Sequence, residues 1–273
     1  MKLQEGPSRR FMLLAPPGAH IPAAFTRPQV DWTRYWSLLH EMQRLRGQVY
    51  LRDGAIRKSA LVDGRHESDL DGSSWHLLVL NAQNRMCGCA RFYEYSRSAI
   101  AGDLKAGRCA LSLSPQWSDT LSAALEAELA FSRDLDRPCV DLGGWALDEE
   151  IRGTTEALRV TLGTYAFWQM RGNAVCLSTA TRRHCASSIL RRIGGHSLRH
   201  NGIELPAYYD PQYNCEMELL KFYSWAPNPR YAIWVSRMKE ELSQISIVAR
   251  HSGPEFSCQD WHPASASATI AWK

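Results

Sequence analysis

The chain has 273 residues, 45% of them hydrophobic, with a formal net charge of +4 and an isoelectric point of about 8.6. A chain of this length and composition can bury a globular core. Its weak basic charge, with Lys and Arg spread along the sequence, does not predict nucleic-acid binding, and no window approaches the roughly 20 apolar residues of a membrane span.

The first 29 residues are expected to be irregular. Residues 1–29 contain five prolines and few periodic apolar positions, which predicts an N-terminal arm over the surface. Ser8-Arg9-Arg10-Phe11 is similar to a twin-arginine export signal, but its apolar run stops at Pro16-Pro17. Such a signal needs about 7–15 apolar residues there. We interpret the segment as a loose leader.

The next part of the chain alternates between helix and strand signals. Apolar residues recur at three- and four-residue steps over residues 30–50, which predicts an amphipathic helix. A charged loop, residues 52–74, separates it from two predicted antiparallel strands at residues 75–81 and 85–94. Residues 118–135 begin with Ser and Asp as caps and continue as a helix.

A strand, a basic glycine turn and a helix follow in close order. Residues 139–147 are a predicted strand, Arg152-Gly153-Thr154-Thr155 is the turn, and residues 156–170 are a helix. A second strand and helix cover residues 174–180 and 182–195. Unpaired backbone N–H groups at a helix start, beside a cation, form a site for an anion. We therefore predict that the turn binds phosphate.

The rest of the chain completes one α/β domain. Asn201-Gly202 predicts a turn between short strands, residues 215–225 read as a central strand, and a helix is expected from about residue 231 to 247. The last residues are rich in Ser, Ala and Pro without periodicity, which predicts a mobile tail. The predicted organisation is an arm at 1–29, a single domain at 30–249 and a tail at 250–273.

The eight cysteines predict neither a metal site nor disulfides. They lack paired Cys-x-x-Cys spacing, and several lie in apolar runs, where free Cys behaves as a small hydrophobic residue. Cys87-Gly88-Cys89 is one residue too short for a zinc knuckle. We expect no metal and a location in the reducing cytoplasm.

The order of elements after residue 139, with Gly194-Gly195 ending the second helix, resembles the GNAT superfamily of acyltransferases. The resemblance implies an α/β fold with a mixed central sheet flanked by helices. It also implies acyl-CoA or acyl-phosphopantetheine as co-substrate, with no permanently bound cofactor. Glu150-Ile151-Arg152-Gly153-Thr154-Thr155 departs from the family's Gln/Arg-x-x-Gly-x-Gly/Ala at its first and last positions. The donor-binding residues implied are Gly143, Gly144, Trp145, Leu147, Arg152, Gly153, Thr154 and Thr155.

The first half carries a second resemblance, to the acyl-homoserine-lactone synthases and N-acyl amino acid synthases. Arg46-x-x-x-Tyr50 precedes an acidic loop and then a strand that ends at Arg91. The family takes an acyl chain from acyl carrier protein and places it on an amine, and the resemblance spans residues 32–222. The acceptor-side residues implied are Arg46, Glu67, Asp69, Asp71 and Arg91, with Asp141 at the position of the family's Glu.

Two departures bear on the acceptor. The third acid, Asp71, comes one residue earlier than in the family's Glu-x-Asp-x-x-Asp, and Gly144 stands where lactone synthases carry an Arg. The second departure weakens the case for S-adenosylmethionine and leaves acylation of another amine. We expect Arg91 and Glu67 to fix opposite ends of the acceptor, with Asp69 orienting Arg91; a solvated acidic turn is the alternative.

The catalytic prediction centres on Asp141. A carboxylate inside an apolar strand needs a partner or a function, and as a base it would take the ammonium proton directly or through water. Backbone N–H groups where this strand splays would polarise the thioester carbonyl. The family's leaving-group Tyr falls on Leu190, so either the thiolate leaves unaided or Ser187 or Ser188 protonates it. His184 reads as an acid–base group or a helix cap.

These observations predict an N-acyltransferase that moves an acyl group from acyl carrier protein or acyl-CoA to an amino acid or small amine. Two alternatives stay open. One is a GNAT-fold binding or regulatory module without turnover, and the other is a conventional acetyl-CoA-dependent N-acetyltransferase. Acyl carrier protein and a small-molecule amine are the expected partners, and nucleic acid is not.

Overall fold

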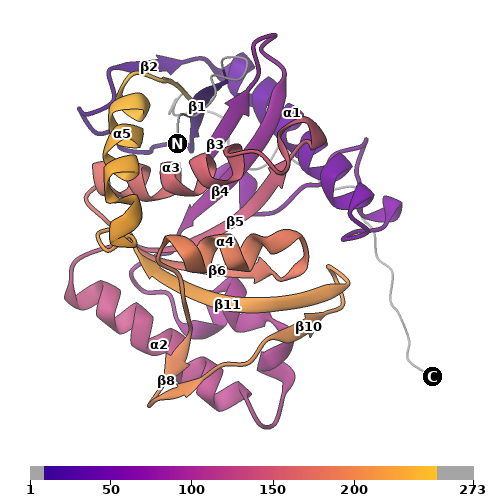
Figure 1. The fold of residues 1–273 in the computed structure, drawn as a ribbon, viewed down its shortest axis with the longest axis vertical. Helices are drawn as coiled ribbons and strands as arrows, with labels where there is room; N and C mark the ends of the chain where they lie inside the picture. Colours follow the sequence, from indigo (N-terminus) through magenta and orange to yellow (C-terminus); the bar gives the residue numbers. More distant parts are fainter. Residues whose placement is uncertain (1–8, 251–273) are drawn as a thin grey trace.

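Ten strands form one mixed sheet in the computed structural model, which describes residues 9–250 (Figure 1). The ten are β1 (Arg10–Ala15), β2 (Arg27–Val30), β3 (Trp75–Leu80), β4 (Met86–Glu94), β5 (Cys139–Leu147), β6 (Val175–Thr181), β7 (His196–Ser197), β10 (Tyr208–Asp210), β11 (Cys215–Tyr223) and β12 (Ser246–Ala249). Their order is β10-β11-β6-β5-β4-β3-β1-β12-β2, and β7 also pairs with β11. A separate pair joins β8 (Arg199–His200) to β9 (Ile203–Glu204).

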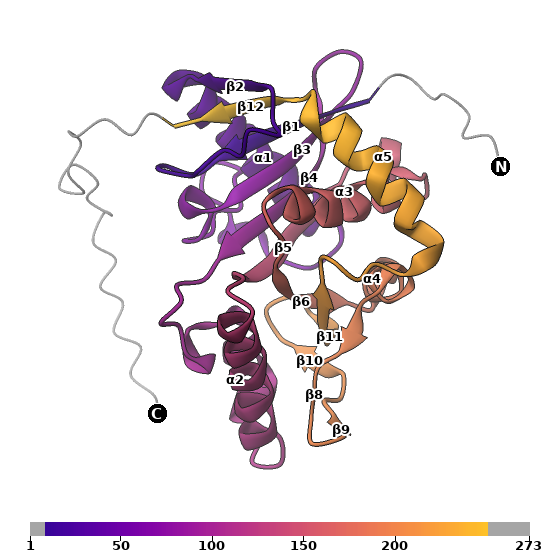
Figure 2. The ribbon, with the colours of Figure 1, turned by 90° about the vertical axis from the view of Figure 1, so that its left-hand side faces the viewer.

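Helices cover both faces of the sheet (Figure 2). They are α1 (Trp32–Arg52), α2 (Ser118–Asp134), α3 (Glu156–Met170), α4 (Ala186–Ile193) and α5 (Ala232–Ser243). Helices α1 and α2 lie on one face, and α3, α4 and α5 lie on the other. The predicted mixed sheet flanked by helices is confirmed. No helix between residues 9 and 250 is long and apolar enough to cross a membrane.

The amphipathic pattern of the first half has a direct structural counterpart. Helix α1 begins at Asp31, whose carboxylate accepts a hydrogen bond from the Arg34 backbone N–H. Its apolar stripe, which includes Tyr35, Leu39 and Met42, is buried against the sheet. The predicted hairpin is also present, because β3 and β4 pair antiparallel.

The predicted irregular arm was wrong. Residues Arg10–Ala15 form β1, which pairs antiparallel with β3 and parallel with β12 in the interior of the sheet. The run Phe11 to Ala15 is almost fully buried and does not alternate, as expected for a strand covered on both faces. The prolines suggested a loop, but Pro16, Pro17 and Pro22 lie in the connection that follows the strand, and Pro28 lies in β2.

The C-terminal helix is shorter than predicted. Helix α5 ends at Ser243, and Ser246–Ala249 forms β12 between β1 and β2. Ile247 and Val248 are fully buried there, and β-branched side chains suit a pleated strand. The predicted tail lies outside the described residues, apart from residue 250.

Two leucine substitutions, one buried and one exposed, test whether β1 belongs to the core. Leu13 is 0% exposed, so Leu13→Ala should lower the free energy of unfolding by about 2–5 kcal/mol, because it leaves a cavity. Leu113 is 86% exposed, so Leu113→Ala should change it by less than about 0.5 kcal/mol. Urea unfolding measures both. Equal small effects would mean that the segment from residue 10 to 15 is not a core strand.

Candidate functional site

The two central strands β5 and β6 separate partway along their length. They pair in parallel only from Cys139 to Asp141, opposite Val175 to Leu177. At the fork, the Ser178 hydroxyl donates to the Leu142 carbonyl oxygen at 2.9 Å. Beyond this point the edge of β5 faces a cavity of about 560 Å³ instead of a partner strand.

A bulge in β5 bends the strand away at this fork. Cys89 pairs with Ala146 and Arg91 with Gly143, so two residues of β5 oppose one residue of β4. Gly144 lies in the bulge with a φ of +61°, which favours glycine. A Cβ atom there would also approach the Arg91 Cβ to 3.0 Å. Both constraints require glycine at this position.

The cavity runs from the start of α3 to the underside of α1. Its walls carry the predicted donor-binding residues Gly143, Gly144, Trp145, Leu147, Arg152, Gly153 and Thr154. Thr155 is the N-cap residue of α3. The lining also includes Tyr50, Arg91, Lys105 and Tyr213. The fold therefore joins the predicted donor turn to Arg91 through one cavity.

The turn before α3 differs from its prediction in one respect. Arg152 is already engaged, because its Nη1 and Nη2 atoms donate to the two Asp53 carboxylate oxygens and its Nε donates to the Leu147 carbonyl. Gly153 has a φ of +71°. Among the described residues, neither the Gly153 nor the Thr155 backbone N–H has a protein acceptor. The turn thus presents backbone N–H groups that a ligand could use, while Asp53 compensates the charge of Arg152.

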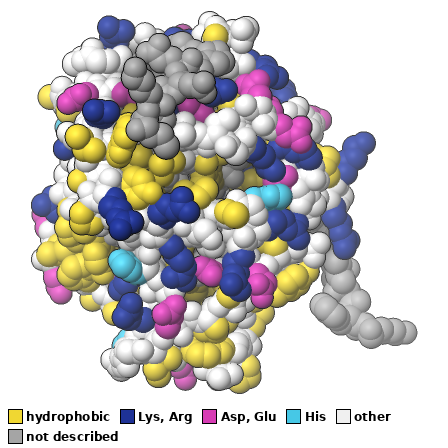
Figure 3. All heavy atoms as spheres, in the orientation of Figure 1, with side chains coloured by type: hydrophobic (Ala, Val, Ile, Leu, Met, Phe, Trp, Pro, Cys, Tyr) yellow, Lys and Arg dark blue, Asp and Glu magenta, His cyan; other side chains and the backbone are white. Residues whose placement is uncertain are grey.

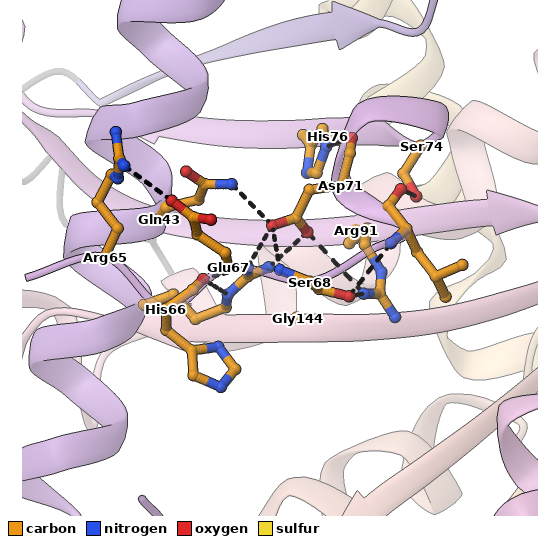
Figure 4. Close-up of polar contacts among 12 residues, drawn as sticks. Gln43, Arg65, His66, Glu67, Ser68, Asp71, Ser74, His76, Arg91 and Gly144 are labelled. Atoms are coloured by element: carbon orange, nitrogen blue, oxygen red, sulfur yellow. Dashed lines mark hydrogen bonds and ion pairs between the residues drawn. The ribbon is translucent and has the colours of Figure 1, made fainter. Parts of the chain in front are cut away.

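A buried ion cluster lies between α1 and the sheet (Figure 4). Arg46 of α1 makes two hydrogen bonds to Asp71, at 2.9 and 2.5 Å. Arg91 of β4 donates to Asp141 of β5 at 2.8 Å and lies 3.9 Å from Asp71. All four side chains are at most 3% exposed. Two cations and two anions therefore neutralise one another at the end of the cavity.

Burial and the charges of this cluster shift the pKa values of its members and neighbours. Burial alone would raise the pKa of Asp71, but hydrogen bonding and charge from Arg46 outweigh it, so that pKa is lowered. Burial lowers the pKa of His76 to about 4, and its Nε2 contacts the Asp71 backbone oxygen at 2.8 Å. Burial and the charge of Arg46 lower the pKa of His66 to about 4. Both histidines are therefore neutral at pH 7.

The acidic loop contributes differently from the prediction. Glu67 is exposed and pairs with Arg65 at 2.9 Å, and Asp69 is exposed. Neither residue lines the cavity, and Asp69 makes no contact with Arg91 among its described hydrogen bonds and ion pairs. Ser68 instead accepts from Arg91 Nη1 at 2.8 Å. The residues either side of Ser68 point outward, because the loop turns into a short 3-10 helix at Asp71.

The four positions predicted near α4 divide between the cavity wall, the core and the surface. Leu190 lines the cavity, whereas Ser187 is buried and Ser188 is exposed, both outside the lining. His184 and Cys185 line the cavity with φ values of +58° and +61°, so α4 begins only at Ala186. Neither serine therefore takes the place of the missing tyrosine at the cavity wall. Within residues 9–250 no group of three or more His, Cys, Asp and Glu side chains is placed to hold a metal.

Sequence reasoning missed Lys105 and Tyr213, which line the cavity opposite Arg91. Both lie in loop segments, Lys105 in a 3-10 turn before α2 and Tyr213 between β10 and β11. Nothing in the local pattern distinguishes them from surface residues. Only the folding of the two loops over the same sheet end brings them together.

Comparisons with known proteins identify the fold. No family model and no curated protein matches the sequence. The structure of a CoA-dependent acyl-homoserine lactone synthase, BjaI, with SAM and isopentyl-CoA superposes with a TM-score of 0.52 at 15% identity, covering 91% of this chain and 96% of that one. The same synthase with MTA gives a TM-score of 0.50, 14% identity and coverages of 91% and 96%. FeeM, an N-acyl amino acid synthase from uncultured soil microbes, gives 0.49 at 12% identity, covering 80% of this chain and 92% of that one. The chain has the GNAT-like fold of the first synthase, as the resemblance implied.

The buried His76 gives the site a measurable pH dependence. Its folded pKa of about 4 lies below the ordinary histidine pKa of 6.5, so the unfolded chain binds the proton first as the pH falls. The free energy of unfolding should fall by roughly 2–3 kcal/mol from this group between pH 7 and about pH 4.5. Its buried Nδ1 atom has no partner among residues 9–250, so protonation would add an unsatisfied donor.

Urea unfolding at the two pH values checks this. His76→Gln should flatten the pH slope but leave the part due to His66, whose pKa is lowered in the same direction. The exposed His196 serves as the matched control, because His196→Gln should keep the full slope. A slope that His76→Gln leaves unchanged would contradict a neutral buried imidazole.

Proposed function

We propose that this protein is an N-acyltransferase that moves an acyl group from a pantetheine thioester to the amine of a small molecule. The observation that carries the proposal is the fork between β5 and β6, where a cavity about 560 Å³ in volume replaces strand pairing. Backbone groups on a buried strand edge need hydrogen-bond partners. A pantetheine arm is a narrow chain with two amides, so it fits the gap and supplies such partners.

The turn before α3 suits the phosphate end of that donor. Gly153 and Thr155 present backbone N–H groups at the start of a 15-residue helix, whose dipole favours an anion. Lys and Arg side chains also gather across the middle of the face that carries α3, α4 and β11 (Figure 3). This supports a CoA diphosphate or a carrier-protein phosphate as the anionic group.

The bulge suits the chemical step. The amine attacks the thioester carbonyl, the carbonyl oxygen gains negative charge, and the carbon–sulfur bond then breaks to release the thiolate. The amine proton passes to a base, and the thiolate takes up a proton. Backbone N–H groups of β5 beside Gly144 lie on the cavity wall, where donors stabilise an oxyanion without reorganisation.

We propose a positioning role for Asp141. Its side chain is buried and is not part of the cavity lining. It accepts a hydrogen bond from Arg91 Nη2 at 2.8 Å. One of its carboxylate oxygens is therefore already engaged by the Arg91 guanidinium. We propose that Asp141 holds Arg91 at the cavity wall. This positioning role takes the place of the role as catalytic base that the sequence predicted.

A thioester assay with free-thiol detection tests the function. Octanoyl-CoA, octanoyl carrier protein and acetyl-CoA are supplied in turn with a panel of amino acids and amines. We expect thiol release that depends on the amine. CoA binding without amine-dependent release from any donor would favour a binding module, and activity with acetyl-CoA alone would favour a conventional acetyltransferase.

Asp141→Asn separates positioning from base catalysis in the same assay. As a positioning residue, its loss should raise the KM for the amine by at least about tenfold and keep the acid limb of the pH profile. Loss of that limb, with an unchanged KM, would restore Asp141 as the base. Thermal unfolding of the variant confirms that it is folded.

The Arg152–Asp53 pair tests the donor end. Arg152→Met removes the bidentate partner of Asp53 beside the turn and leaves it the longer 3.8 Å contact with Arg52, so the dissociation constant of CoA should rise at least about tenfold through repulsion. Isothermal titration with CoA measures it. In the Arg152→Met/Asp53→Asn variant, recovered affinity assigns binding to the amides, and continued weakness assigns it to Arg152 itself. Unchanged affinity in the single variant would remove the phosphate from this turn.

A further inference from the structure

The departing thiolate needs a proton, and the residues that the sequence suggested do not supply one. Ser187 and Ser188 lie outside the cavity lining, and the Leu190 side chain has no proton to give. The arginine side chains of the lining keep their protons at every accessible pH. Five hydroxyl groups of the lining already donate to backbone carbonyl oxygens, those of Thr154, Thr161, Thr164, Ser178 and Thr181.

Tyr50 brings another hydroxyl to the free edge of β5. Its Oη atom donates to the Trp145 carbonyl oxygen at 3.4 Å, and both residues line the cavity. Directly after β5, the Asp148 N–H donates to the Cys87 carbonyl of β4 at 2.8 Å. Backbone groups alternate in direction along a strand, so Trp145, an odd number of positions away, turns its backbone from β4 towards the fork. The Tyr50 hydroxyl therefore lies beside the bulge.

The contact with Trp145 leaves this hydroxyl available to a ligand. An O–H···O hydrogen bond is usually about 2.7–2.8 Å long, so a contact of 3.4 Å is weak. Burial is the largest influence on the phenol and raises the pKa of Tyr50, with a further contribution from Tyr213. The hydroxyl therefore keeps its proton at pH 7, and a free phenolate is unfavourable here. Such a group suits a step in which one proton arrives as another leaves.

The ring of Tyr50 is held in one orientation. His66 and Tyr213 pack against it edge to face, with their ring centres 5.2 and 6.1 Å away. Arg46 lies one helical turn earlier on the same face of α1 and is fixed by its two hydrogen bonds to Asp71. The buried ion cluster therefore also positions the Tyr50 hydroxyl at the fork.

We infer that Tyr50 relays a proton from the attacking nitrogen to the departing sulfur, a role that rests on the proposed acyl transfer. A neutral amine that adds to the thioester carbonyl becomes positive at nitrogen, while the carbonyl oxygen becomes negative. Nitrogen and sulfur are then bonded to one carbon, so a single hydroxyl reaches both. As the carbonyl re-forms, the carbon–sulfur bond breaks and its electron pair goes to sulfur. Tyr50 gives its proton to that sulfur and takes one from nitrogen, which leaves a neutral amide, a neutral thiol and a protonated Tyr50.

Donors with leaving groups of different basicity test the relay. Tyr50→Phe keeps the ring and removes the hydroxyl. With octanoyl-CoA at a fixed amine concentration, kcat/KM should fall about 10²-fold, because an alkyl thiolate leaves poorly without a proton. With the octanoyl thioester of 5-thio-2-nitrobenzoic acid it should fall less than about threefold, because this aryl thiolate is stable without one. Thermal unfolding shows whether the variant is folded.

Tyr209→Phe is the control, because Tyr209 is exposed and its variant should keep both rates. A second measurement needs no variant. Thiol release from octanoyl-CoA by the natural protein should be slower in D₂O, because the relay moves two protons as the bond breaks.

Equal losses with the two donors in folded Tyr50→Phe, an unchanged rate with octanoyl-CoA, or equal rates in H₂O and D₂O would overturn the relay. Each of these results would leave the acyl transfer itself standing. Absence of thiol release from the natural protein with every donor and amine would instead overturn the proposed function, and the relay with it.

Discussion

The structure depends on the point at which β5 and β6 stop pairing. Up to Asp141 the two strands form an ordinary parallel ladder, and beyond it the bulge at Gly144 turns β5 aside. Helices cover both faces of this mixed sheet, so the backbone groups on the separated edges need hydrogen-bond partners. The Ser178 hydroxyl satisfies one carbonyl at the fork, and the remaining edge opens onto the cavity. A ligand that brings hydrogen-bonding groups therefore completes the sheet rather than resting on its surface.

The ion cluster beneath α1 stabilises the wall of that cavity at a cost. Burying four charged groups carries a large desolvation penalty, which an apolar cluster would avoid. The four charges are nevertheless paired, because Arg46 binds Asp71 twice and Arg91 binds both Asp141 and Ser68, and among residues 9–250 only the Nε atom of Arg91 is left without a partner in the two guanidinium groups. Such a network permits one geometry, whereas apolar side chains would pack in several. It fixes helix α1 against β4 and β5 and so fixes the orientation of Arg91.

Sequence periodicity predicted most helices and strands, because burial imposes it locally. The first strand was not predicted, because a run covered on both faces has no alternation and its neighbouring prolines suggested a loop. Asp141 was recognised because a carboxylate in an apolar strand is conspicuous, but its partner 50 residues away was not visible. The outward orientation of Glu67 and Asp69 was missed for a related reason. Which side of a loop faces inward is decided by tertiary contacts, and spacing alone does not encode it.

The distribution of charge along the cavity gives it a direction. At the α3 end, Arg152 is neutralised by Asp53, so backbone amides and the helix dipole supply the attraction for an anion. In the middle, Gly143 and Gly144 present backbone only. Under the proposed function, the phosphate of the donor lies at the start of α3 and its thioester reaches the bulge, because the two glycines leave the backbone of β5 accessible there.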